Sequence, residues 1–144
     1  MCTENYPIRP FFRLDVLIKE VKELGKNKGY TFEPTTGMEF SLEEHCVYFK
    51  SGKRYMMYFG SWAPFWEQTS HPLCFGIDDR WEEETKGLKA AFVNACTGGT
   101  KSFGDHWTMG WFTKEDLLAD DPSEQIWKRI EPILKAIYRL TEPT

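Results

Sequence analysis

Long apolar runs are missing from this chain of 144 residues. A helix needs about 18 consecutive apolar residues to cross a membrane, and no such run occurs. The first residues, Met-Cys-Thr-Glu-Asn-Tyr-Pro, supply neither the basic flank nor the apolar core of a signal peptide. We therefore expect a cytoplasmic protein that has no membrane partner.

Paired cysteines are missing as well. The four cysteines are far apart and form no Cys-x-x-Cys pair: Cys2, Cys46, Cys74 and Cys96. Structural zinc sites need four ligands brought close together, and a chain without a signal peptide keeps its thiols reduced. Cys74 or Cys96 could join a histidine and an acid in a nucleophilic triad, but no local signature marks one. We predict no metal site, no cofactor and no catalytic residue.

The chain also lacks an excess of positive charge. The chain has 18 basic and 22 acidic residues, which gives a net charge of −4. Affinity for a phosphate backbone comes mostly from lysine and arginine, so this balance disfavours nucleic acid as a partner. We expect the partner to be a small molecule or a protein.

What the chain does have is an ordinary globular composition with many aromatic residues. Hydrophobic residues make up 41% and aromatic residues 16%. A chain of this length can bury a single hydrophobic core. Because it contains no internal repeat, low-complexity tract or dividing linker, we expect one domain over residues 1–144.

Apolar residues recur at helical spacing in three segments, which predicts helices over 11–25, 79–96 and 122–140. Gly25 is expected to end the first helix, and Gly87 to weaken the second without interrupting it. The sequence Asp-Pro-Ser-Glu, which begins at Asp121, is typical of a helix start.

Two β-rich runs, 45–50 and 54–59, are joined by Ser-Gly-Lys and predict a hairpin. Further strands are predicted over 73–77 and 105–112, and a short strand and a turn over 30–40. We expect 60–72 to be a loop or a single helical turn, and 97–102 to be a flexible connection. The order predicts an α+β domain: a mainly antiparallel or mixed sheet of four to five strands with three helices packed on it.

The stretch 55–77 holds seven aromatic residues in 23 positions and is the most informative part of the chain. Its rings, with others further along the chain, could form a tryptophan-rich core. Alternatively, they could line a ligand-binding pocket or surface, with two polar side chains at its edge. The residues of this candidate site are Trp62, Phe65, Trp66, Trp81, Trp107 and Trp111, with His71 and Arg80 at the edge.

Acidic residues offer a second, weaker signal, because most of them stand at expected caps and turns. Among them we single out the neighbours Asp105 and His106 as a candidate acid–base pair.

The pattern Tyr58-Phe-Gly-Ser-Trp62, then Phe65-Trp66, then Pro72-Leu-Cys-Phe-Gly-Ile77 resembles small orphan domains of bacterial and phage proteins. Some of these domains are grouped near the restriction-endonuclease-like PD-(D/E)xK fold. The resemblance implies an Asp and a (D/E)-x-Lys pair on adjacent strands, which bind magnesium for phosphodiester cleavage. Glu20-Val-Lys22 and Glu84-Thr-Lys86 have that spacing, but both lie on predicted helices, and the hairpin strand reads Tyr48-Phe49-Lys50.

Three hypotheses follow. The leading one is a non-catalytic binding module that recognises a small ligand, a nucleotide or a protein segment through the bend at 62–66 and the neighbouring rings. The alternative is a magnesium-dependent nuclease-like enzyme or its inactive descendant. The third is an accessory protein that forms a homodimer through exposed aromatic residues.

Overall fold

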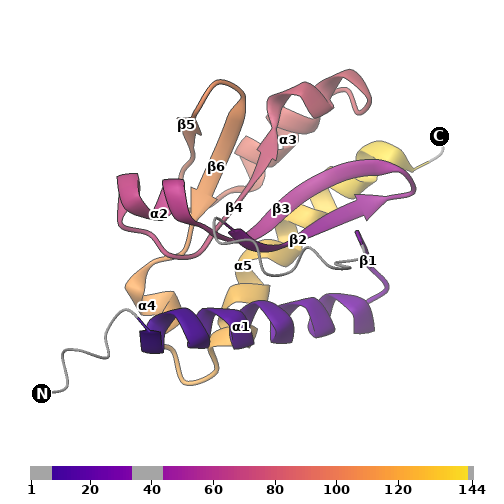
Figure 1. Cartoon of the computed structure of the whole chain (residues 1–144). Coiled ribbons are helices and arrows are strands. Elements are labelled where there is room, and N and C mark those ends of the chain that lie inside the picture. The colour runs from indigo at the N-terminus through magenta and orange to yellow at the C-terminus, as the bar shows by residue number, and fades with distance from the viewer. Residues whose placement is uncertain (1–7, 34–43, 143–144) are drawn as a thin grey trace, which may run out of the picture.

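The computed structural model describes residues 8–33 and 44–142, and in it an antiparallel sheet of six strands carries the helices (Figure 1). The strand order is β1-β2-β3-β4-β6-β5, and every neighbouring pair is antiparallel. The strands are β1 Thr31–Phe32, β2 Glu44–Ser51, β3 Arg54–Trp62, β4 Cys74–Asp78, β5 Lys101–Phe103 and β6 Trp107–Trp111. The predicted α+β class, antiparallel pairing and central hairpin are confirmed. The extra strand is β5, which forms in part of the segment expected to be a flexible connection.

Five α-helices and two short 3-10 helices occur in the described residues, where three helices were expected. They are α1 Ile8–Asn27, α2 Ala63–Thr69, α3 Leu88–Ala95, α4 Lys114–Leu117, α5 Pro122–Tyr138, η2 Asp79–Glu83 and η3 Arg139–Thr141. Of the additional α-helices, α2 lies where a loop or a single helical turn was expected, and α4 lies outside the predicted helices. The predicted start of α5 is confirmed, because the Asp121 carboxylate accepts a hydrogen bond from the backbone N–H of Glu124.

Both glycine predictions are wrong. Gly25 lies inside α1, where a Cβ would come within 3.1 Å of the Phe32 ring, so the glycine allows the helix to pack closely. The helix continues to Asn27. Gly87 has a φ of +87°, a left-handed conformation that interrupts the expected helix and separates η2 from α3. The turn expected near 33–37 lies mostly outside the described residues.

The main core lies between one face of the sheet and the helices α1, α3 and α5, so these three helices cover the same face. Figure 1 shows α1 running beneath the β2–β3 hairpin, with α5 behind it. Side chains on a strand alternate between faces. Val47, Phe49, Phe59, Phe75 and Ile77 point into this core, and their neighbours along the strands therefore point to the opposite face. That opposite face carries the candidate site.

Candidate functional site

The face of the sheet opposite α1, α3 and α5 carries a continuous group of aromatic rings, which we call the aromatic face. Its members are Tyr48, Tyr55, Tyr58, Trp62, Trp81, Phe103 and Trp107. Each ring lies 5.0–6.3 Å, centroid to centroid, from at least one other member. Four of the six strands and η2 contribute to the group. Parts of the chain that are far apart in sequence therefore form one aromatic surface.

A β-bulge places both tyrosines of the sequence Tyr-Met-Met-Tyr on this face. The register shifts after Phe49, which pairs with Met57, so that Lys50 pairs with Tyr55. Met56 is the extra residue, and both methionines are fully buried in the main core. Without the bulge, strict alternation would put Tyr55 and Tyr58 on opposite faces. The sequence pattern does not predict this shift in strand register.

The 3-10 helix η2 lays Trp81 over the sheet. Its indole stacks on the ring of Tyr55 at 5.4 Å and 19°, and it meets the indole of Trp107 edge to face at 5.7 Å. Asp78 begins this helix by accepting a hydrogen bond from the backbone N–H of Arg80. This cap stands at the predicted start of the 79–96 helix, but the helix that it begins is shorter than expected.

Trp62 closes the other end of the aromatic face. Its ring lies 5.0 Å from Phe103 and 5.7 Å from Trp107. Phe65, on α2, packs against Phe103 at 5.1 Å and is fully buried, so it supports the face from within. The structure therefore brings together four of the eight predicted site residues: Trp62, Phe65, Trp81 and Trp107.

The exposure of the rings distinguishes this face from ordinary core. Tyr48, Tyr55, Trp62, Trp81 and Trp107 are all half-buried, so part of each ring reaches solvent. By contrast, large side chains on the helix side of the same strands, such as Phe49 and Phe59, are fully buried. Neither indole of the predicted bend, Trp62 or Trp66, is sealed from solvent.

An ion-paired cluster borders the rings at the end of β4. The buried carboxylate of Asp78 accepts hydrogen bonds from Nε and Nη2 of Arg80, and its Oδ2 lies 3.4 Å from Nε2 of His106. Burial alone raises the pKa of the Asp78 carboxyl, but the Arg80 hydrogen bonds and the nearby His106 outweigh it, and the pKa is lowered. His106 therefore faces Asp78, and its sequence neighbour Asp105 is exposed. The pairing of Asp105 with His106 is a prediction that the geometry does not support.

The remaining predicted residues are not part of the connected rings, although Trp111 lies on the same face of β6 as Trp107. Trp66, four residues after Trp62, packs against the main core, as Trp81 also does in part, but it contacts no ring of the aromatic face. It also lines a pocket of about 370 Å³ with Ala63, Glu67 and Ser70. His71 stacks on Trp111 at 5.3 Å and 15°, and burial, together with the charge of Lys101, lowers the pKa of this imidazole.

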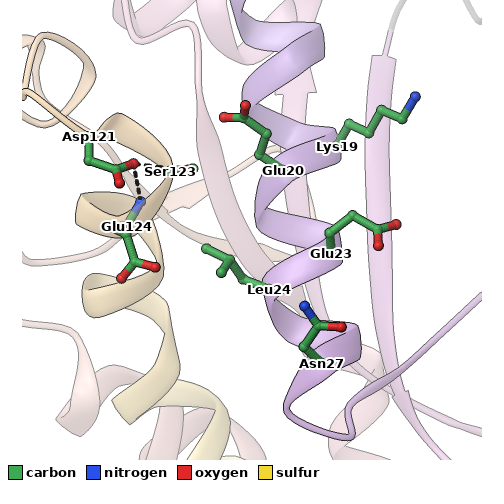
Figure 2. A pocket seen from close by; sticks show the side chains of 8 residues that line it. All are labelled: Lys19, Glu20, Glu23, Leu24, Asn27, Asp121, Ser123 and Glu124. Atoms are coloured by element: carbon green, nitrogen blue, oxygen red, sulfur yellow. Dashed lines mark hydrogen bonds between the residues drawn. The ribbon is translucent and has the colours of Figure 1, made fainter.

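A second hollow, between α1 and α5, was not anticipated from the sequence. Figure 2 shows side chains of both helices around this pocket of about 450 Å³, with Leu24 among them. Four carboxylates line it. The Asp121 carboxylate accepts hydrogen bonds from the Ser123 hydroxyl and from the backbone N–H of Glu124. Residues about a hundred positions apart form this pocket, so no local pattern could reveal it.

The residues considered for chemistry are dispersed. Glu20 and Lys22 lie on α1, and Glu84 and Lys86 lie in the turn between η2 and α3. Cys74 is fully buried, and burial raises the pKa of the Cys96 thiol to about 12, which makes it a poor nucleophile at neutral pH. Within residues 8–33 and 44–142, no three or more His, Cys, Asp or Glu side chains gather as a metal site would require. Over the same residues, no helix combines the length and apolarity needed to span a membrane.

Comparison with known proteins finds no family model, no curated protein and no solved structure that matches this chain. The functional proposal therefore depends on the geometry of the aromatic face.

Proposed function

We propose that the protein is a non-catalytic binding module and that the aromatic face is its binding surface. The observation that carries the proposal is the partial exposure of five contiguous tyrosine and tryptophan rings on the sheet face opposite α1, α3 and α5. Exposed apolar patches of this kind mark interaction sites. Tyrosine and tryptophan also contribute most per residue to binding energy, because they bury large area and lose little side-chain entropy.

The shape of the surface favours an extended partner over a small molecule. The pockets at Trp66 and between α1 and α5 are not lined by any ring of the aromatic face. The rings of the face instead pack against one another, and each of the five half-buried rings presents part of its surface to solvent. A peptide segment can cover several such rings at once, so we take a protein segment as the partner.

A selection experiment tests this proposal. Random peptides displayed on phage are enriched on the wild-type protein and retested on two variants, Trp107→Ala and Trp66→Ala. Both side chains are half-buried tryptophans, but only Trp107 belongs to the aromatic face. We expect enriched peptides to bind Trp107→Ala about tenfold or more weakly and Trp66→Ala with unchanged affinity.

Circular dichroism of each variant shows whether the fold is intact, and Trp81→Ala replaces Trp107→Ala if it is not. Peptides that bind the aromatic-face variant as well as the wild type would overturn the proposal. So would a loss of binding confined to Trp66→Ala, because the site would then be the pocket on α2.

The magnesium-dependent nuclease-like enzyme, or its inactive descendant, stays a prediction from the sequence resemblance. Titration of the wild-type protein with magnesium chloride separates the two ideas. Magnesium binding at a carboxylate site would change the tryptophan fluorescence or the melting temperature. Neither quantity should change if the aromatic face is the functional site, because its rings offer magnesium no carboxylate ligands.

A further inference from the structure

We draw no further inference here: the strongest candidate, the hollow of about 450 Å³ between α1 and α5, is a cluster of exposed acidic side chains, and nothing else in residues 8–33 and 44–142 points to a ligand that would fill it.

Discussion

At the scale of single residues, Asp78 is the side chain that ties the aromatic face to the rest of the sheet. It is the residue paired with Trp107 in the β4–β6 register, it begins η2, and it binds Arg80. A buried carboxylate in this position is stable only because its charge is matched by hydrogen bonds and by a cation. Its protonation should therefore be visible in the stability of the whole chain.

We predict that Asp78→Asn lowers the free energy of unfolding by about 1–2 kcal/mol at pH 7. The pKa of this carboxyl is lowered in the folded protein, so its stabilisation is complete above the unfolded pKa of about 3.9. It is lost as the pH falls below that value, through the lower folded pKa. Urea unfolding at pH 7 and pH 3 should show the gap between wild type and variant closing in acid.

The control for this measurement is Asp105→Asn, which changes an exposed carboxyl beside the same histidine. It should shift stability by no more than about 0.5 kcal/mol at either pH. A gap for Asp78→Asn that is the same at both pH values would contradict the assigned role of its charge.

At the scale of elements, a buried carboxylate joins α4 to α5. Oδ2 of Asp116 accepts hydrogen bonds from the backbone N–H of Thr113 and, at 2.6 Å, from Nη1 of Arg129, and Oδ1 accepts one from Gln125. The Thr113 side chain completes a capping box. The capping box involves neighbouring residues only, whereas the ion pair with α5 depends on the fold.

Replacing Asp116 with alanine should cost about 3–5 kcal/mol of unfolding free energy, because it leaves the largely buried Arg129 without its carboxylate. Asp121→Ala is the matched control, since it removes an aspartate cap that is exposed. That change should cost about 1 kcal/mol. Denaturant unfolding of both variants measures the difference, and equal losses would show that Asp116 acts as a cap alone.

At the scale of the whole molecule, the sequence predicts those elements that depend on local periodicity. The hairpin, β4, β6 and the closing helix follow from alternation, apolar spacing and caps, which are properties of neighbouring residues. Trp107, Met109 and Trp111 share one face of β6, as their alternation predicts.

The composition of the candidate site could be predicted only in part, because it depends on where elements begin and end. Trp62 is the last residue of β3 and Trp66 lies on α2, so two tryptophans of one bend face different layers. The bulge at Met56 brings Tyr55 to the aromatic face, and η2 brings Trp81. These outcomes depend on tertiary pairing, which a single sequence does not display.

The most direct test of the central claim follows the six indole N–H signals of the protein in a nitrogen–proton correlation spectrum while a selected peptide is added. If the aromatic face is the binding surface, the signals of Trp62, Trp81 and Trp107 move together, and those of Trp66 and Trp127 stay in place. Movement confined to Trp66 and Trp127, or no movement of the first three at saturation, would contradict the account.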